Sequence, residues 1–341
     1  MDHNLKIVVL GGGISTERQV SLVTATSVCK ALRSSGYKAV FVDMFLGVED
    51  PAGRLEDIFD APDGLCGSVS VGRDAPDIEE VIASRKDQSA SRIGKNVLEI
   101  CKMADCVFLG LHGKDGEDGK IQALLDLFGI PYTGSGSVGS AMALDKGITR
   151  MVMQANGIRC APLTDHAPCV VKCANGGSSI GTYICNTEEE YRSALDEVKK
   201  YDTSFLVEQK INGTELTVPV LDGTPLAPIE IVPPQSGKFD YVAKYQSGSD
   251  GAREICPARL SAEKTLEVQK AAKKLHEALH LSVYSRTDFI MDEHGDFWCL
   301  EINTLPGLTP NSLLPKSAAN AGIDYQHLCE SIIRLSMDIK R

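Results

Sequence analysis

Short apolar runs alternate with amphipathic stretches along the first 135 residues. Apolar, mostly β-branched runs predict three strands there, at residues 6–10, 38–43 and 104–111. Apolar residues at helical spacing predict two helices, at residues 20–32 and 121–128. Because strands and helices alternate, we expect a doubly wound α/β domain with a parallel sheet. Residues 50–95 are polar and glycine-dotted, and only 54–60 and 77–85 have helical spacing there.

The pattern changes after Gly136. Helical spacing recurs at 140–156, 187–201, 261–279, 312–320 and from residue 325 onward. The helix at 187–201 has a predicted N-cap, with Thr187 followed three residues later by Glu190. Strands are expected at 169–172 and 204–209, and mostly strands from there to residue 304. Residues 285–291 and 297–302 flank a polar turn, so we expect them to pair as a hairpin.

Composition and charge exclude some classes of function. The 341 residues include 35 Lys and Arg against 46 Asp and Glu, a net charge of -11, which argues against a nucleic-acid-binding protein. No apolar run approaches the length of a membrane span, and the N-terminus lacks the pattern of a signal peptide. Eleven cysteines without a C-x-x-C pair indicate a reducing compartment, and we expect a cytoplasmic protein.

The first candidate site is the glycine turn at 11–16. It follows a strand and precedes a helix, and Asp43 ends the next strand, as in a dinucleotide-binding domain. However, Thr16 stands where the third glycine of that motif would lie. Two other interpretations stay open, namely a tight structural turn, or a turn that brings Glu17 to the ammonium group of a substrate.

Two further glycine-rich stretches follow predicted strands. Residues 111–119 combine three glycines with three acids, and His112 lies at the strand tip, where parallel sheets bind ligands. Lys172 ends a strand and is followed by a glycine- and serine-rich loop at 174–181, whose N–H and hydroxyl groups suit phosphate oxygens. A solvated loop is the alternative for the first stretch. The second is a weak signal alone.

The strongest candidate is the predicted hairpin near residue 290. Spacing of two puts Arg286 and Asp288 on one face of the first strand, and Glu301 and Asn303 on one face of the second. Two carboxylates and an amide oxygen suit Mg²⁺ that holds nucleotide phosphates, and an arginine would neutralise a transferring phosphoryl group. The alternative is an ion-pair ladder on an exposed sheet. Acids between apolar strand positions favour the metal, because buried charges need partners.

These residues lie in motifs that together resemble the D-alanine–D-alanine ligases of the ATP-grasp superfamily. The ordered motifs span nearly the whole chain and are GGGISTERQVSL (11–22), LHGKDGEDG (111–119), IPYTGSG (130–136), LDK (144–146), GGSSIG (176–181), DYVAKY (240–245), CPA (256–258), RTDF (286–289) and EINTLPGLTPNSLLP (301–315). Only residues 45–100 and the stretch around 160–171 are not covered. That second stretch is short for the family, and Cys173 replaces a common proline.

The resemblance implies a doubly wound N-terminal domain (1–134), a central ATP-binding lobe (135–208) and a C-terminal ATP-grasp lobe (209–341). The implied reaction joins two D-alanines to D-alanyl-D-alanine for peptidoglycan synthesis. ATP and two Mg²⁺ ions, for which Mn²⁺ can substitute, are the implied cofactors. The implied partners are D-alanine, ATP and a second copy of the chain, with neither nucleic acid nor membrane.

The resemblance also assigns roles to particular residues. It implies catalytic roles for Glu17, Ser178, Tyr245 and Arg286. The implied amino-acid contacts, with Lys244 near the γ-phosphate, are His112, Lys244, Gly307, Ser312 and Leu313. The implied ATP contacts are Lys146, Lys172, Glu208, Ile211 and Glu215, and the implied metal ligands are Asp288, Glu301 and Asn303.

Several functions remain in competition at this point. The pair Lys244 and Tyr245 disfavours a D-alanyl-D-lactate ligase, and Leu313 disfavours a D-alanyl-D-serine ligase, so D-alanine is the expected second substrate. Another carboxylate–amine ligase is the first alternative. A nucleotide-binding protein without catalysis is the second, and a nicotinamide dehydrogenase, suggested by the first glycine turn and Asp43, is the third.

Overall fold

The computed structural model describes residues 4–49, 53–67, 77–177, 181–233 and 252–340. The chain forms two compact units. Unit 1 comprises residues 1–138, 282–284 and 305–341, and unit 2 comprises residues 139–281 and 285–304. Within the described ranges, no helix has both the length and the apolar character needed to cross a membrane.

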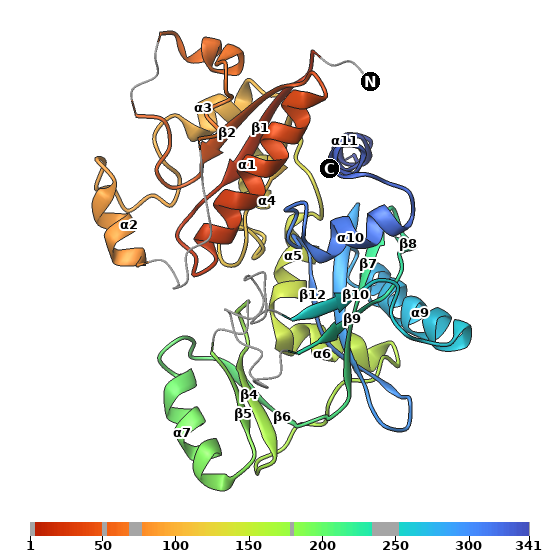
Figure 1. Cartoon of the computed structure of the whole chain (residues 1–341). Coiled ribbons are helices and arrows are strands. Elements are labelled where there is room, and N and C mark those ends of the chain that lie inside the picture. Colours follow the sequence, from red (N-terminus) through yellow and green to blue (C-terminus); the bar gives the residue numbers. More distant parts are fainter. Residues whose placement is uncertain (1–3, 50–52, 68–76, 178–180, 234–251, 341) are drawn as a thin grey trace. The chain divides into compact units, whose positions relative to one another are not determined.

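Unit 1 contains the predicted parallel sheet. Its strands β1 (Lys6–Gly11), β2 (Lys38–Asp43) and β3 (Cys106–Leu109) pair in the order β2-β1-β3, all parallel (Figure 1). The central strand has an uninterrupted apolar run from Ile7 to Leu10, and all four residues are fully buried. An uninterrupted apolar run is what a parallel strand covered on both faces requires. The sheet therefore confirms the expectation for this part of the chain.

Helices complete unit 1. The helix α1 (Arg18–Ser34) packs on β1 and β2, and α4 (Lys120–Leu127) follows the glycine-rich stretch after β3. The segment between β2 and β3 contains a 3₁₀ helix η1 (Leu55–Asp60), a short α2 (Ile78–Ser84) and α3 (Val97–Lys102). The first two coincide with the predicted helical stretches, whereas α3 was not expected.

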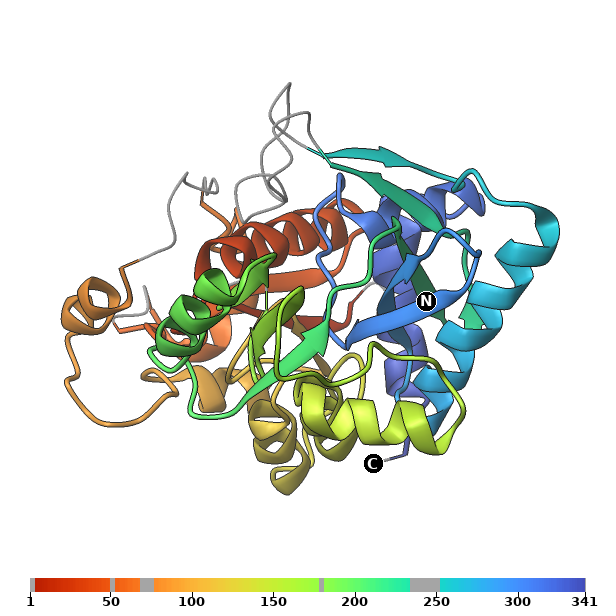
Figure 2. The same ribbon diagram turned by 90° about the horizontal axis from the view of Figure 1, so that it is seen from below.

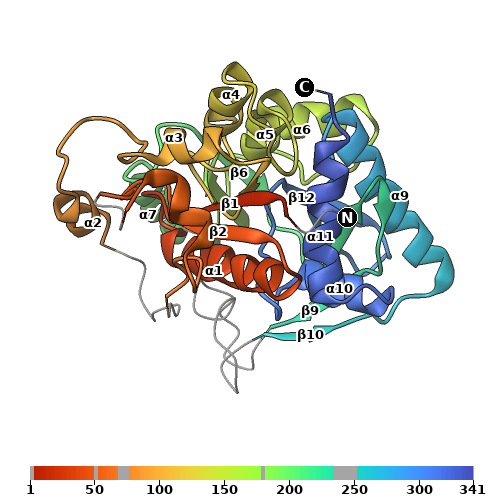
Figure 3. The same ribbon diagram turned by 90° about the horizontal axis from the view of Figure 1, so that it is seen from above.

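The C-terminal helices α10 (Leu313–Asn320) and α11 (Tyr325–Met337) also belong to unit 1. The helix α11 packs against α10, α1 and β3, as Figure 3 shows for the neighbouring helices. Its buried face includes Leu328, Ile332 and Ile333. The last part of the chain thus returns to the N-terminal sheet, although the three-part division of the chain stays a prediction.

The larger sheet of unit 2 carries the predicted hairpin. Strands β7 (Thr214–Leu221), β9 (Ile229–Val232), β10 (Arg253–Ile255), β11 (Tyr284–Met291) and β12 (Phe297–Asn303) follow the order β10-β9-β7-β11-β12. The short β8 (Thr224–Pro225) pairs with β7. The helix α9 (Ala262–Ala278), cyan in Figure 2, packs on this sheet through Val268, Ala272 and Leu275. Ser261 caps its first turn.

A smaller sheet of unit 2 has its own core. Strands β4 (Cys169–Cys173), β5 (Thr182–Cys185) and β6 (Phe205–Gln209) pair antiparallel in the order β5-β4-β6. The helix α7 (Glu188–Val198) covers one face (Figure 1), and Thr187 with Glu190 forms the expected capping box. The short stretch before β4 is held to both sheets, because Cys299 N donates to Arg159 O and Thr164 N donates to Val207 O.

The prediction of one helix over 140–156 was wrong. The structure has two helices, α5 (Ser137–Leu144) and α6 (Lys146–Ala155), separated at Asp145. Asp145 is extended, with φ -77° and ψ 105°, and its carboxylate accepts a hydrogen bond from Ile148 N. Asp is a strong N-cap residue, so it begins a new helix instead of continuing the old one. The break makes Lys146 the first residue of α6.

Candidate active site

The hairpin of β11 and β12 brings its four polar residues together as predicted. Asp288 lies directly opposite Glu301, and Arg286 lies directly opposite Asn303. Residues directly opposite each other in an antiparallel pair extend to the same face, so all four side chains share one face of the sheet. The pairing register shifts between Asp288 and Phe289, so these four residues pair in a different register from the rest of the hairpin.

Asp288 accepts hydrogen bonds from three residues. Its side chain accepts two hydrogen bonds from Arg286, with Nε at 3.0 Å from Oδ1 and Nη2 at 2.8 Å from Oδ2. Thr217 Oγ1 on β7 donates to Oδ1 at 2.6 Å, and Asn303 Nδ2 donates to Oδ2 at 3.3 Å. Only 9% of Asp288 is exposed, so these donors stabilise a carboxylate that water hardly reaches. No sequence pattern pointed to a role for Thr217.

Glu301 is paired with Lys146. Lys146 Nζ lies 3.1 Å from Glu301 Oε2 and donates to Gly176 O at 2.5 Å. The ammonium group therefore connects the hairpin to the glycine-rich loop that follows β4. Because Asp145 starts the helix, this lysine projects from the first turn of α6. Two predicted ATP-binding features, the lysine and the loop, thus meet the predicted metal ligand.

A second ion-pair group lies on the smaller sheet. Lys172 Nζ on β4 is 2.7 Å from Glu208 Oε2 on β6, and Arg150 Nη1 on α6 is 3.2 Å from Glu208 Oε1. Arg150 also donates to Ala161 O. All three charged groups are buried, and the two cations compensate the carboxylate. Sequence reasoning missed Arg150, although its spacing of four from Lys146 placed both on one helix face.

The remaining predicted ATP contacts lie where the two sheets of unit 2 are joined. Ile211 is half-buried in the connection between β6 and β7, and Glu215 is half-buried near the start of β7. Unit 2 therefore brings together the predicted phosphate, metal and nucleotide residues that the structure describes. Ser178, Lys244 and Tyr245 lie outside the described residues, so their roles stay predictions.

Among the described residues, no group of three His, Cys, Asp or Glu side chains is arranged to hold a metal ion. The oxygen donors that these facing hairpin residues offer are the Asp288 and Glu301 carboxylates and the Asn303 amide. This set fits a hard cation such as Mg²⁺ that takes its remaining ligands from phosphate and water. Behind this face, burial and the nearby Asp288 charge raise the pKa of the Cys299 thiol, so that thiol stays neutral.

The predicted amino-acid contacts lie in unit 1. Glu17 precedes α1 and is 7% exposed, and its backbone N–H donates to Ser15 Oγ at 3.2 Å. Ser15 Oγ donates in turn to His112 O at 2.7 Å. A Cβ atom added at Gly113, where φ is +71°, would lie 2.8 Å from a Glu17 carboxylate oxygen. The glycine turn and the stretch 111–119 thus approach each other closely because glycine follows His112.

His112 is buried, and both of its ring nitrogens have protein partners. A carbonyl oxygen only accepts, so Nδ1 carries the hydrogen that it shares with Leu305 O at 2.9 Å. Nε2 lies 3.0 Å from Thr24 Oγ1. The N–H of the same Leu305 donates to Glu117 Oε1 at 3.2 Å, and Glu117 Oε2 accepts from Gly113 N at 2.8 Å. His112 and Glu117 therefore hold both polar backbone groups of Leu305, a role that sequence reasoning missed for Glu117.

The turn after Leu305 carries the other predicted amino-acid contacts. Ser312 Oγ accepts from Thr309 N at 3.1 Å and lies 2.8 Å from Thr309 Oγ1. A Cβ atom added at Gly307 would be 3.0 Å from Ser312 Oγ, so glycine permits this close approach. Leu313 is the first residue of α10, and backbone N–H groups in a first helical turn lack partners within the helix. This end of α10 suits a carboxylate.

The geometry of Asp43 argues against the dehydrogenase interpretation. Asp43 Oδ2 lies 2.5 Å from Arg18 Nη2, and Oδ1 accepts from the backbone N–H groups of Phe45 and Leu46. Arg18 also donates to Gly13 O at 2.6 Å. The carboxylate that a ribose would need is thus already bonded to groups of the turn itself. The glycine turn therefore serves as a structural support for Glu17, the residue before Arg18.

Two family models match this chain. The model described as D-ala D-ala ligase N-terminus matches residues 6–135, and the one described as D-ala D-ala ligase C-terminus matches residues 155–334. The D-alanine–D-alanine ligase of Pediococcus pentosaceus is 41% identical over 347 residues, which cover 96% of this chain and 97% of that protein. The ligase of Lacticaseibacillus casei is 37% identical, with coverage of 96% and 95%.

Solved structures agree with the sequence comparisons. The D-alanine–D-alanine ligase of Bacillus anthracis complexed with ATP has a TM-score of 0.71 and 28% identity, covering 98% of this chain and 97% of that one. The D-alanine–D-alanine ligase of Coxiella burnetii has a TM-score of 0.72 and 28% identity, with coverage of 98% and 94%.

Proposed function

The chain belongs to the D-alanine–D-alanine ligase family, and from this premise we propose that it joins two D-alanines to D-alanyl-D-alanine at the expense of ATP. Its fold is the one expected, a doubly wound N-terminal domain with an ATP-grasp region. The observation that supports the proposal most directly is the hairpin register, which gathers Arg286, Asp288, Glu301 and Asn303 on one face.

The chemistry explains why a nucleotide is needed. A carboxylate is a poor acyl donor, because oxide would have to leave when an amine attacks. Transfer of the γ-phosphoryl group to one carboxylate oxygen forms an acyl phosphate, and phosphate then leaves as the amine of the second D-alanine attacks. The protein must position both substrates and stabilise the charge that develops. Arg286, beside Asp288, would stabilise the tetrahedral intermediate.

The nucleotide would bind to unit 2. Lys146 and Lys172 would bind the α- and β-phosphate oxygens, and their present carboxylate partners keep both side chains oriented. Glu208 would face the adenine amino group, the backbone near Ile211 would pair with the ring, and Glu215 would bind the ribose hydroxyls. Lys244 would contact the γ-phosphate.

Two Mg²⁺ ions, or Mn²⁺ in their place, would be held by Asp288, Glu301 and Asn303. The opposed carboxylates and adjacent amide are the donor types that such ions prefer. When bound, the ions would neutralise phosphate charge during transfer. Lys146 and Arg286 balance the two carboxylates in the meantime.

Unit 1 would bind the amino acids. The Glu17 carboxylate would accept the ammonium of the first D-alanine, with His112 orienting the surrounding turn. Ser312 and the N–H of Leu313 would bind the carboxylate of the second D-alanine, and Gly307 would let the substrate approach the backbone. Ser178 and Tyr245 would join Glu17 in closing loops over the reaction, which protects the acyl phosphate from water.

The cellular role, compartment and oligomeric state are proposed as well. The product would be the terminal dipeptide of peptidoglycan precursors, made in the cytoplasm by a homodimer. All eleven cysteines lie in the described ranges, none of them is in a disulfide, and most are buried, which suits a reducing compartment. The smaller sheet has an apolar core of its own, formed by residues between 169 and 207, which supports a central ATP-grasp lobe.

The experiment is a substrate panel with ATP and Mg²⁺. Purified protein is given D-alanine alone, or D-alanine with D-lactate or D-serine, and both phosphate and the joined product are measured. We expect D-alanyl-D-alanine to predominate, with one phosphate released per dipeptide. Predominance of a D-serine or D-lactate product would contradict the second-substrate assignment, and ATP binding without any product would contradict the ligase.

A further inference from the structure

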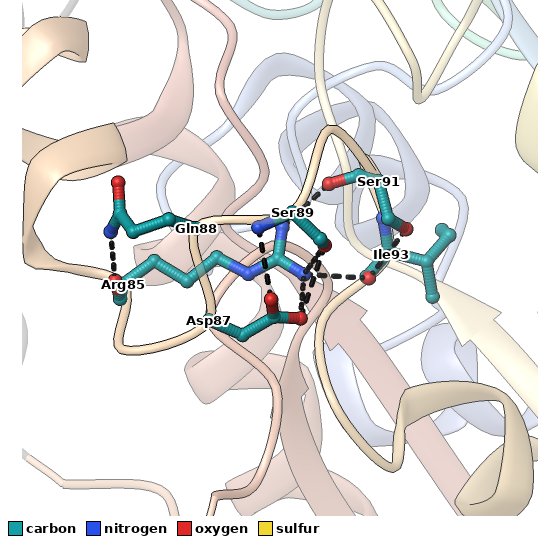
Figure 4. A network of polar contacts seen from close by, with 6 residues as sticks. All are labelled: Arg85, Asp87, Gln88, Ser89, Ser91 and Ile93. Carbon is teal, nitrogen blue, oxygen red and sulfur yellow. Dashed lines mark hydrogen bonds and ion pairs between the residues drawn. The ribbon is translucent and has the colours of Figure 1, made fainter.

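The segment between α2 and α3 is organised around one buried arginine. The side chain of Arg85 is 2% exposed. Its Nη1 donates to Ser91 O at 2.5 Å, and its Nη2 donates to Ile93 O at 3.1 Å and Ser89 Oγ at 3.3 Å (Figure 4). Asp87 balances its charge at 3.3 Å and accepts from Ser89 N. One guanidinium thus holds residues 87–93 in a closed loop.

This loop is attached to the end of β2. The Arg85 guanidinium lies over the Phe45 ring, 4.8 Å from its centroid. Gly94 N donates to Met44 O at 2.8 Å, and Val48 N donates to Lys95 O at 3.0 Å. Both ends of the loop therefore contact the residues that follow β2. No family motif falls within the loop.

Arg92 connects this loop to the turn that carries His112 and Glu117. Its Nε lies 2.7 Å from Asp115 Oδ2. Asp115 is 4% exposed, and apart from this ion pair no polar partner reaches Oδ2 from any residue in the described ranges. The other nearby cation, Lys120, is 3.6 Å from Oδ1. Arg92 is therefore the main compensation for a buried carboxylate, and burial makes such compensation important.

Asp115 lies inside a tight turn. It has a φ of +70°, in the left-handed region that Asp adopts more readily than most non-glycine residues. Glu117 N donates to Gly113 O at 2.8 Å, and Glu117 Oε2 accepts from Gly113 N at 2.8 Å. Any movement of Asp115 would therefore displace Glu117, and with it the hydrogen bond to Leu305.

We propose that Arg92 is a positioning residue, which holds the 112–117 turn through Asp115 and is itself placed by the loop around Arg85. The inference extends the proposed function, because that turn would orient the first D-alanine next to Glu17. Removal of Arg92 is expected to loosen the turn and weaken D-alanine binding. ATP binding is expected to remain, because the proposed nucleotide residues belong to unit 2.

The test compares Arg92→Gln, Arg92→Lys and Asp115→Asn with the wild type. Arg54→Gln is the matched control, because Arg54 is 77% exposed and pairs with Asp57 on the surface of the same unit. Amide hydrogen exchange of residues 112–117 is measured first, which requires no activity. KM for D-alanine and KM for ATP are then measured separately.

Arg92→Gln should speed exchange in the turn and raise KM for D-alanine about tenfold while KM for ATP stays within about twofold. Arg92→Lys should recover part of the loss, and Asp115→Asn should resemble Arg92→Gln. Unchanged exchange in Arg92→Gln and Asp115→Asn, or a parallel rise of both KM values, would overturn the inference. An inactive wild type would instead refute the proposed function, and the exchange result would still decide the role of Arg92.

Discussion

Several buried charges among the described residues pair with groups of opposite sign. Arg18 pairs with Asp43, Glu208 lies between Lys172 and Arg150, and Glu230 on β9 bonds to Arg259. Arg259 holds the pKa of the Glu230 carboxyl below its usual value. Burying an unpaired charge is costly, so removal of one partner should harm the protein more than loss of a surface ion pair.

His276 is a buried ionisable group that the fold keeps uncharged. His276 on α9 is 3% exposed, and its Nδ1 lies 2.8 Å from Ser285 Oγ. Burial lowers the pKa of His276 to about 4, while the neighbouring Glu277 opposes this and Lys273 adds to it. The folded protein thus keeps the ring neutral below pH 6.5, where the unfolded chain already takes up a proton.

This difference predicts acid sensitivity. Stability due to the neutral ring should be complete above pH 6.5 and decline as the pH falls toward 4, by roughly 3 kcal/mol in total. His276→Gln should flatten the pH dependence in this window, as measured by urea unfolding at several pH values. His294→Gln, at a side chain 78% exposed, serves as the control. Equal slopes for wild type and His276→Gln would rule out this source of acid sensitivity.

At the scale of residues, the sequence predicted which side chains could bind a metal ion better than it predicted which side chains contact one another. It identified Asp288, Glu301 and Asn303 because acids on apolar strands are conspicuous. It left Asp43 open, because a dinucleotide ligand and an arginine partner place the same demand on that position. Thr217 could not be foreseen, since its contact with Asp288 depends on β7 lying beside β11.

At the scale of elements, the hairpin of β11 and β12 determines the proposed metal site. Register fixes which side chains face each other, and a slip by one residue would turn them to the opposite face. The site therefore depends on the pairing of Asp288 with Glu301 as much as on the residues themselves.

Asp288→Asn tests this hairpin. Loss of the carboxylate charge should lower Mg²⁺-dependent turnover roughly 100-fold and raise the Mg²⁺ concentration needed for half-maximal rate. Turnover is measured over a Mg²⁺ titration, and thermal unfolding verifies that the variant folds. Glu293→Gln changes an exposed acid on the same hairpin and should behave as wild type. A normal rate and normal Mg²⁺ dependence for Asp288→Asn would remove this residue from the site.

The elements themselves were largely predictable. Strands with continuous apolar runs, such as β1 and β2, and capped helices, such as α7, were found at nearly their observed limits. The break at Asp145 was missed because apolar spacing continues across it, and only the capping geometry reveals the new helix. The short α3 and β5 were missed because few residues carry their pattern.

At the scale of the molecule, each unit gathers one class of predicted residue. The described nucleotide and metal residues lie in unit 2, and the amino-acid residues lie in unit 1, to which the chain returns after Thr304. Sequence motifs predicted both groups. They did not reveal the return, because the packing of α11 on α1 and β3 joins residues far apart in the chain.

The central claim is that ATP activates the carboxylate of one D-alanine for attack by the amine of another. The most direct measurement supplies D-alanine with ¹⁸O in its carboxylate, together with ATP and Mg²⁺, and determines the label in the released phosphate. An acyl phosphate passes one carboxylate oxygen to phosphate when the amine displaces it, so we expect one labelled oxygen in each phosphate. Dipeptide formed with unlabelled phosphate would contradict the account.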